Sequence, residues 1–389
     1  MTTETINAEI KAEDIGTLLN KHGARSFLVG GCVRDKLLGI EPKDYDIEVY
    51  GLTPEKLKSI IRDHYILDEI GASFQVLKIK GWDIEISTPR REVQIGDKHT
   101  SFKTEYDPNM SYVDACSRRD VTCNAIMQCL TTGEYIDPLG GIEDLRDKII
   151  KPTSPRFKED PLRVLRAMQF IGRFEMHWTI ELQEMCSELN PSQLSRERIW
   201  EEWLKYLLKS TPDGIIMGWQ FLRDCEWTKY FPEIHNLIGC PQSELNHPEG
   251  CVWTHTGFCL QEYAKHRTGN EYEDIVVGLA VLCHDFGKPQ WTRYEEGKFK
   301  AHGHEKGGED PTRRFLGGIT NQRNIIEDVV ALVVNHLKPV QLHKANSKMG
   351  AVRRLALRIP IERLLRVCTA DIHEDLLLYQ TLPHVTGYV

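Results

Sequence analysis

The 389-residue sequence has no long apolar run, no excess of basic residues and no paired-cysteine motif. Without about 20 consecutive apolar residues, no segment is expected to cross a bilayer, so we expect no membrane partner. The first residues, Met1–Glu4, lack the basic-then-apolar pattern of a secretory leader. The eleven cysteines include no Cys-x-x-Cys pair and no Cys/His spacing of a structural zinc site. Dispersed thiols in odd number indicate a reducing compartment, and we expect a cytoplasmic protein.

The length exceeds what one hydrophobic core usually organises, so two or three domains are expected. Hydrophobic residues make up 41% and charged residues 27% of the chain, which is typical of a globular protein. The net charge of -8 gives no overall attraction to nucleic acid. Basic residues nevertheless gather at Arg90-Arg91, at Arg118-Arg119 and between Arg156 and Arg198. A local basic track for phosphate is therefore compatible with the acidic total.

Two glycines and two aspartates mark the first candidate site. The apolar run Phe27–Val29 ends at Gly30-Gly31, a helical turn follows, and Asp44 and Asp46 then lie in a second strand. Glycines at a helix start let backbone N–H groups approach a polyphosphate. Strand side chains alternate, so Asp44 and Asp46 point the same way, and two close carboxylates repel unless a cation lies between them. Hard oxygen ligands of this kind suit Mg²⁺.

Periodicity predicts the elements around this site. We expect helices over residues 8–21 and 53–65, and strands over 74–79 and 82–86. Glu85 or Asp83 would add a third carboxylate beside the first two, or either would be an exposed acid on an edge strand. Residues between Glu85 and Arg118 show little periodicity, and we expect a long irregular loop of functional use there.

The stretch Gly-Gly-x-Val-Arg-Asp-x-Leu-Leu-Gly followed by Asp-x-Asp resembles the opening of the class II tRNA nucleotidyltransferases (CCA-adding enzymes) and the related bacterial poly(A) polymerases. Residues 117–125, 136–145 and 195–202 resemble later blocks of the same family, with Val121 and Cys123 as mild departures. In CCA-adding enzymes the loop after the third carboxylate is flexible and helps switch the pocket from C to A. Its apparent full length here argues against a CC-only enzyme.

The resemblance implies roles for particular residues. Asp44, Asp46 and Glu85 would be catalytic, with Asp44 and Asp46 holding Mg²⁺. The expected nucleotide-binding residues are Gly30, Gly31, Arg34, Arg118, Arg119, Asp120, Asn124, Asp160, Arg163, Arg166 and Arg198. Physically, the two adjacent arginines offer bidentate donors to phosphate, and Asn124 suits a ribose hydroxyl or the loop backbone. In isolation, such a charge run is an ordinary solvated face.

Asp160 and Arg163 suggest how a nucleotide is selected. A helix is predicted from Asp160 onward, with Pro161 in its first turn, so that the two side chains share one face. Aspartate accepts from an exocyclic amine and arginine donates to ring acceptors, a pattern that cytosine and adenine offer and that uracil and guanine reverse. The family uses its Glu-Asp-x-x-Arg motif in this way. An ordinary helical salt bridge is the competing interpretation. Arg198, in a following helix capped by Ser195, is expected to support this helix.

Histidines and aspartates in the second half indicate another metal site. His284-Asp285 follows an apolar helix, with His255 upstream and Asp371 far downstream, although a single histidine is more often a core residue. This pattern looks like the HD phosphohydrolase domain, in which these four residues would bind one divalent transition metal or Mg²⁺. His302, His304 and His336 would hold a second metal or contact phosphate. The expected activity is on 2′,3′-cyclic or terminal phosphates.

Taken together, the expected fold is α+β. We expect a nucleotidyltransferase head with a small mixed sheet at 1–150, a helical neck at 151–220, and a helical body with the HD domain at 221–389. The expected reaction is untemplated addition of CCA to tRNA from CTP and ATP. One Mg²⁺ would activate the tRNA 3′-hydroxyl and a second would stabilise departing pyrophosphate. The oligomeric state is left open.

Two alternatives remain. A poly(A) polymerase of the same family would carry a basic Gly-Arg-Arg-Phe-like stretch where this chain has Gly71–Phe74, and would tend to have a long basic C-terminus. An HD phosphohydrolase whose front half only binds RNA is a rival of another class. The intact Asp44, Asp46, Asp160 and Arg163 favour a catalytic front half.

Overall fold

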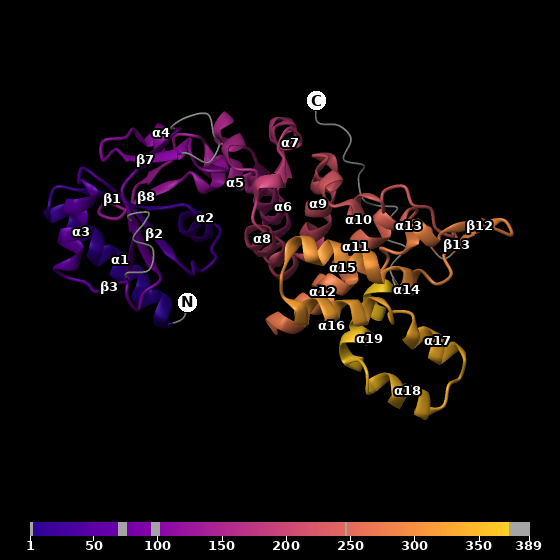
Figure 1. The fold of residues 1–389 in the computed structure, drawn as a ribbon. Coiled ribbons are helices and arrows are strands. Elements are labelled where there is room, and N and C mark those ends of the chain that lie inside the picture. The colour runs from indigo at the N-terminus through magenta and orange to yellow at the C-terminus, as the bar shows by residue number, and fades with distance from the viewer. Residues whose placement is uncertain (1–2, 69–75, 95–101, 246, 373–389) are drawn as a thin grey trace. The chain divides into compact units, whose positions relative to one another are not determined.

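The computed structural model describes residues 3–68, 76–94, 102–245 and 247–372. The chain divides into two compact units, Met1–Glu159 and Asp160–Val389. In Figure 1 the first unit runs from indigo to magenta and the second continues to yellow. The two units differ in architecture and are described in turn.

A seven-stranded sheet forms the framework of the first unit, in the order β3-β4-β5-β2-β1-β8-β9. Strands β2 and β5 pair in parallel, whereas the other neighbours in this sheet are antiparallel. The elements of the unit are α1 (Thr3–Lys21), β1 (Arg25–Val29), α2 (Gly31–Leu37), β2 (Tyr45–Tyr50), α3 (Pro54–Arg62), β3 (Leu67–Asp68), β4 (Leu77–Ile79), β5 (Ile84–Ser87), β6 (Arg90–Gln94), β7 (Phe102–Tyr106), α4 (Tyr112–Cys116), β8 (Met127–Cys129), β9 (Tyr135–Ile136), α5 (Gly141–Arg146) and β10 (Ile149–Ile150), with 3-10 turns at Thr122–Asn124 and Pro155–Glu159.

Alternation along β1 places apolar side chains on both faces of the sheet. Leu28 joins a core that includes Ile15 of α1 and Ile60 of α3. Phe27 and Val29 join a second core on the opposite side of the strand. A central strand buried on both faces is fixed in register, because a slip by one residue would exchange the two cores. The sheet is therefore a rigid base for the acidic residues of β2.

Most of the expected elements of this unit are present. The first helix was expected over 8–21 and begins earlier, at Thr3, while α3 begins after Thr53, whose hydroxyl accepts from the Lys56 N–H. The prediction of an irregular loop between Glu85 and Arg118 was wrong, because β6 and β7 pair there and α4 follows. Backbone pairing in a two-stranded ribbon needs no apolar period, so periodicity could not reveal it. The Gly71–Phe74 comparison and residues 95–101 of the loop lie outside the described residues.

Helices form most of the second unit. Its elements are α6 (Leu162–Phe174), β11 (His177–Trp178), α7 (Ile180–Ser187), α8 (Arg196–Lys209), α9 (Pro212–Asp224), α10 (Pro232–His235), α11 (Val252–Lys265), α12 (Glu271–Cys283), α13 (Lys288–Trp291), β12 (Arg293–Glu295), β13 (Lys298–Lys300), α14 (His304–Gly307), α15 (Glu309–Ile319), α16 (Arg323–Val333), α17 (Lys338–Lys344), α18 (Met349–Ala356) and α19 (Ile361–Asp371), with 3-10 turns at Pro191–Gln193 and Trp227–Tyr230.

Helix α12 is the centre of the second unit. Its residues from Asp274 to Cys283 are all buried, and it packs against α11, α16, α19 and α8. Such a helix, apolar on all sides, belongs inside a bundle. His284 and Asp285 follow directly at its C-terminal end, so the bundle fixes their position.

The predicted α+β class, with a mixed sheet in front and helices behind, is confirmed. The division into three domains at 150 and 220 stays a prediction. Among the described residues, no helix combines the length and the apolar character required to cross a membrane.

Candidate active sites

Acidic and basic side chains meet in a cavity of the first unit with a volume of about 280 Å³. Asp46 on β2 stands opposite Glu85 on β5 in the parallel register, so both carboxylates project from the same face of the sheet. The charged and hydroxyl residues that line the cavity are Asp46, Glu48, Glu85, Ser87, Thr88, Arg90, Arg118 and Arg119. Glu85, and not Asp83, therefore supplies the further carboxylate in this cavity, while the Asp83 carbonyl accepts from the Tyr45 N–H at 2.8 Å.

Burial and like charge act together on Asp46. Its pKa rises from 3.8 to about 6, chiefly because it is buried, and Asp44, Glu85 and Glu48 add to the rise while Arg119 opposes it. Asp44 itself is exposed just before β2 begins. Excess negative charge in a concave site is what a divalent cation relieves, and carboxylate oxygens are the ligands that Mg²⁺ prefers. The residues present therefore fit a magnesium site.

Gly30 leaves room for an arginine beside this acidic group. It has a φ of 78°, in the region that favours glycine, and precedes α2. A Cβ at this position would lie 2.8 Å from Nη1 of Arg119 and 3.7 Å from Oδ2 of Asp46. The glycine turn thus lets the guanidinium and the carboxylate come close to the backbone.

A buried network ties together three of the predicted nucleotide-binding residues. Arg34 donates from Nη1 to Asn124 Oδ1 at 2.6 Å, and Asn124 donates from Nδ2 to Asp120 Oδ1 at 2.9 Å. All three side chains are buried. Both ends of the Asn124 amide are thus occupied within the protein, so the residue steadies the turn before β8. Direct nucleotide contact by these three residues stays a prediction.

At the start of the second unit, Asp160 caps the predicted helix instead of lying within it. The helix begins at Leu162, whose N–H donates to Asp160 Oδ1 at 3.1 Å. The predicted start at Asp160 was thus two residues early, because the aspartate side chain replaces the missing helical acceptor. Its other oxygen, Oδ2, accepts from Arg198 Nη2 of α8 at 2.6 Å. Arg198 therefore holds the Asp160 carboxylate in place. Arg163 follows three residues later, in the first turn of α6.

Arg166, one turn further along α6, faces the buried Glu202 of α8. Its Nη1 atom lies 4.0 Å from Glu202 Oε1, which also accepts from Lys205 at 2.7 Å. The Arg166–Glu202 pair thus joins α6 to α8, and the Asp160–Arg198 pair joins the residue that caps α6 to the same helix.

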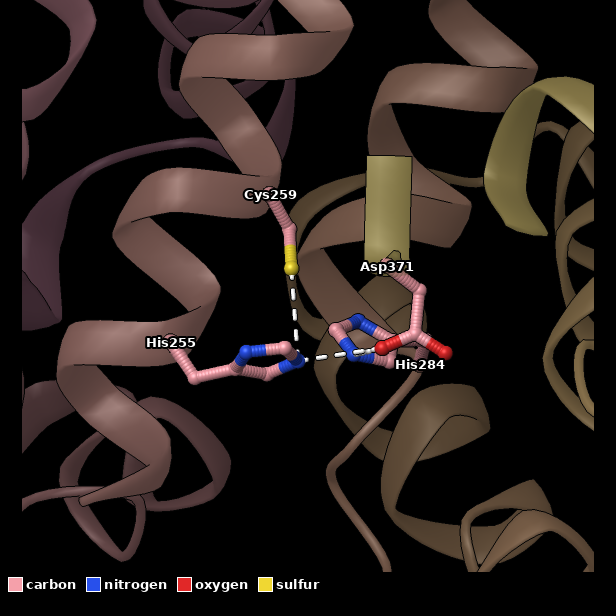
Figure 2. A group of neighbouring side chains, drawn as sticks. All are labelled: His255, Cys259, His284 and Asp371. Carbon is pink, nitrogen blue, oxygen red and sulfur yellow. Dashed lines mark hydrogen bonds and ion pairs between the residues drawn. The ribbon is translucent and has the colours of Figure 1, made fainter. Parts of the chain in front are cut away.

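The four predicted metal ligands of the second unit lie close together, and three of them, His255, Asp285 and Asp371, line a cavity of about 900 Å³. His255 Nε2 lies 3.0 Å from Asp371 Oδ1, and His284 Nε2 lies 3.5 Å from the same oxygen. Asp285 Oδ2 lies 3.3 Å from His284 Nε2 and 3.8 Å from His255 Nε2. Figure 2 shows the two imidazoles, from α11 and from the end of α12, turned toward the carboxylate at the end of α19.

Each histidine of this cluster donates a hydrogen bond from its Nδ1 atom, and this bond fixes the orientation of the imidazole ring. His284 Nδ1–H donates to the Val281 carbonyl at 2.7 Å, and His255 Nδ1–H donates to Glu249 Oε1 at 2.9 Å. His304 and His336 each donate from Nδ1 to the carbonyl three residues earlier, also at 2.7 Å. This arrangement turns each Nε2 toward the cavity and suits it to a metal. The donor set fits a divalent ion.

His304 and His336 extend the cluster around Asp285, and the three form a second group of neighbouring donors. Asp285 Oδ1 lies 3.2 Å from His304 Nε2, and Lys288 Nζ lies 2.6 Å from Asp285 Oδ2. His302 lines the cavity but belongs to no donor group among the described residues. The prediction of a second metal position is thus compatible with His304 and His336.

Burial and pairing shape the charges of this site. Burial would raise the pKa of Asp285, but His284 and Lys288 beside it hold that pKa well below its usual value. Burial would lower the pKa of His284, yet the Asp285 carboxylate raises it well above the ordinary value. Burial lowers the pKa of His336 to about 4, so this imidazole is neutral near pH 7 and available as a ligand.

Sequence reasoning gave no role to several residues of the two sites. Glu48 follows Asp46 by two, so the period of a strand would have placed it in the same cavity. Cys259 follows His255 by four and Lys288 follows Asp285 by three, the spacings of helical neighbours. Glu249 had no such signal, because it reaches His255 from a loop.

Comparison with known proteins gives consistent matches. Residues 26–151 match the family model described as the Poly A polymerase head domain. The "Multifunctional CCA protein" of Mannheimia succiniciproducens is 32% identical over 363 residues, which cover 89% of this chain and 83% of the relative. That of Pasteurella multocida is 33% identical over 360 residues, with the same coverage.

Solved structures share the fold. The Bacillus stearothermophilus CCA-adding enzyme in complex with CTP is similar with a TM-score of 0.63 and 22% identity, over 95% of this chain and 78% of that one. A structure described as a tRNA-processing enzyme in an apo form gives a TM-score of 0.59 at 21% identity, over 98% and 94% of the two chains.

Proposed function

The chain belongs to the multifunctional CCA protein family of class II tRNA nucleotidyltransferases, and we propose that it adds or repairs the 3′-terminal CCA of tRNA from CTP and ATP without a nucleic-acid template. The observation that carries this proposal is the cavity in which Asp46 and Glu85 face Arg118 and Arg119. Carboxylates beside guanidinium groups suit a nucleoside triphosphate together with its divalent ion.

In this proposal Asp44 and Asp46 hold Mg²⁺, with Glu85 as the third carboxylate. When bound, the ion neutralises triphosphate charge and favours ionisation of the tRNA 3′-hydroxyl. That hydroxyl oxygen attacks the α-phosphorus of CTP or ATP, a new phosphodiester bond forms, and pyrophosphate leaves. Arg118 and Arg119 donate to the phosphates. Gly30 and Gly31 give the polyphosphate close access to the backbone.

Selection of the base is assigned to Asp160 and Arg163. The carboxylate accepts from the exocyclic amine of C or A, and the guanidinium donates to the neighbouring ring acceptor. Uracil and guanine present the opposite pattern, so the carboxylate would meet a carbonyl and the guanidinium would meet an N–H, and neither base pairs with them. Arg198, through its 2.6 Å contact with Asp160 Oδ2, holds the carboxylate in one orientation. The resemblance adds Arg166 as a further nucleotide contact.

We further propose that the second unit is an HD-type phosphohydrolase acting on 2′,3′-cyclic or terminal phosphates. His255, His284, Asp285 and Asp371 would hold a divalent ion, which supplies an activated water when bound. Lys288 at the cavity wall, with Lys298, Lys300 and Lys344 also lining the cavity, favours an anionic substrate. None of the eleven cysteines, all of which lie within the described residues, is in a disulfide, which supports an activity in the cytoplasm.

The two sites should be separable by mutation. Asp46→Ala is expected to abolish nucleotide addition to tRNA lacking its 3′ end while leaving hydrolysis of a 2′,3′-cyclic nucleotide intact. His284→Ala is expected to give the reverse result. Loss of both activities in either variant, with the protein still folded by circular dichroism, would contradict independent sites.

Poly(A) polymerase activity is the second candidate, because the matching family model carries that description. Incubation of a CC-ended tRNA with ATP alone separates the two. Addition of one A supports the CCA assignment, and a long A tail supports the alternative.

A further inference from the structure

A cysteine lies against the histidine and aspartate donors of the second unit. Cys259 is on α11, one helical turn after His255, and its side chain is fully buried. Its Sγ atom lies 3.4 Å from His255 Nε2, the same nitrogen that faces Asp371. Figure 2 shows the sulfur pointing from α11 toward the same His255 nitrogen that is joined by a dashed line to the Asp371 carboxylate. The thiol therefore shares the metal-facing side of the histidine.

The spacing of these atoms is that of ligands around one ion. One donor atom each from His255, Cys259, His284 and Asp371 lies within 4.8 Å of all the others. The separations from Asp371 Oδ1 are 3.0 Å to His255 Nε2 and 3.5 Å to His284 Nε2. Tetrahedral Zn²⁺ with its usual bond lengths places neighbouring ligand atoms about 3.4–3.6 Å apart. The cluster thus needs little adjustment to surround an ion.

An independent feature points to the same centre. His284 is only 1% exposed, and its Nδ1–H is committed to the Val281 carbonyl. Its Nε2 atom makes no hydrogen bond with any residue that the structure describes, and it lies only within ion-pair distance of two proposed ligand oxygens, Asp285 Oδ2 at 3.3 Å and Asp371 Oδ1 at 3.5 Å. A buried imidazole nitrogen without a hydrogen bond is costly unless something else binds it. A metal ion beside Cys259 would satisfy this nitrogen.

We propose that Cys259 is a ligand of this metal, which adds one sulfur to the nitrogen and oxygen donors of His255, His284, Asp285 and Asp371 and makes the centre take Zn²⁺ and related borderline ions in preference to Mg²⁺. A thiolate is a soft ligand that selects zinc-like ions, whereas Mg²⁺ is bound through oxygen. On binding, the S–H bond breaks, the sulfur lone pair joins the metal and the proton passes to solvent. The proposal rests on the assigned metal site and not on the substrate that the site hydrolyses.

Zinc K-edge X-ray absorption on the full chain loaded with one equivalent of Zn²⁺ identifies the atoms bound to the metal and their distances. Asp46→Ala serves as the background, so that the front carboxylates do not compete. The proposal predicts a Zn–S distance of about 2.3 Å, which disappears in Cys259→Ser. Cys225→Ser, which alters a buried cysteine of the same unit outside the donor group, should keep it. The Zn²⁺ affinity of Cys259→Ser should fall on the order of a hundredfold.

A spectrum with only nitrogen and oxygen neighbours in the Cys259-containing protein would overturn the proposal, and this result needs no cysteine variant to fold. A Zn–S distance that persists in Cys259→Ser would also overturn it, because another cysteine would then be the ligand. A Zn–S distance without hydrolysis of cyclic phosphates would remove the proposed hydrolase and leave the ligand assignment standing.

Discussion

Asp46 and Glu85 stand opposite one another on the parallel strands β2 and β5. Residues paired in register on neighbouring strands project from the same face of the sheet, so both carboxylates line the same cavity. Neighbouring strands are only about 4.8 Å apart, so the charge of Glu85 adds to the rise in the Asp46 pKa that burial causes, while Arg119 opposes it. The first unit thus holds electrostatic strain that a bound divalent ion relieves.

Nucleotide addition should depend on the protonation of Asp46. Its pKa of about 6 means that the carboxylate is charged above that pH and protonated below it. At limiting Mg²⁺, the addition rate should fall about tenfold for each pH unit below 6, because the protonated acid does not bind the ion. Glu48→Gln removes a like charge, lowers the pKa of Asp46 and should therefore move the fall in rate to lower pH. A rate that stays flat between about pH 5 and pH 7 in both proteins would contradict this account.

The same pKa predicts a stabilising but inactive variant. The folded protein binds the Asp46 proton more tightly than the unfolded chain does, because the pKa rises from 3.8 to about 6. The free energy of unfolding of the metal-free protein therefore falls as pH rises from about 4 to 6, and the penalty is complete above 6. Asp46→Asn removes the charge and should raise the unfolding free energy by about 1–3 kcal/mol at pH near 8.

Urea unfolding in the presence of a chelator measures this effect. The gain should nearly vanish at about pH 4, where Asp46 is protonated in both states. An Asp46→Asn variant that is less stable than wild type at pH near 8 would show that the carboxylate is held by favourable contacts instead.

The sequence predicted the parts of the two sites that depend on local patterns, but it could not predict the parts that depend on contacts between distant segments. Asp46 and the His284-Asp285 pair were recognisable because strand period and adjacency are local. The prediction that Asp44 also lies in the second strand was wrong, because β2 begins at Tyr45. The Asp46–Glu85 register and the convergence of His255 with Asp371 depend on pairing between distant segments, and only resemblance could suggest them. Cys259 was overlooked because a lone cysteine in an apolar helix is usually core. Asp160 was placed inside a helix because a cap and a first-turn residue give the same sequence signal.

Arg198 should act on nucleotide binding through Asp160. Arg198→Ala frees the carboxylate that now accepts at 2.6 Å, and we expect KM for CTP and ATP to rise about tenfold with a smaller change in kcat. Both side chains are partly exposed, so the pair contributes less than about 1 kcal/mol to stability and Tm should hardly change. Arg198→Lys should restore part of the loss. Kinetics identical to wild type in Arg198→Ala would remove the positioning role.

Asp160→Ala and Arg163→Ala should relax base selection more than they slow chemistry. Each variant removes one of the two groups that reject U and G, so misincorporation of UTP and GTP should rise by about tenfold or more relative to CTP and ATP. Competition assays with all four nucleotides measure the ratio. Unchanged rejection of UTP and GTP in both variants would eliminate the pairing argument.

Glu249 should tune metal affinity at the second site. It accepts from His255 Nδ1 at 2.9 Å and also from His247 Nδ1 at 2.9 Å. Glu249→Gln weakens the orientation of His255, and Zn²⁺ affinity should fall by about 10- to 100-fold in calorimetric titration. His247→Ala leaves the Glu249–His255 contact in place and should change affinity much less. Equal losses in the two variants would indicate a general disturbance of the loop.

The most direct test of the front site is stepwise incorporation on a tRNA that ends before its CCA, with each nucleotide supplied separately. CTP alone should extend the tRNA by two residues, ATP alone should add none, and both together should add three and stop. UTP and GTP should add none, and Asp46→Ala should be inactive throughout. Extension by ATP alone into a long tail, or no extension with any nucleotide, would contradict the assignment.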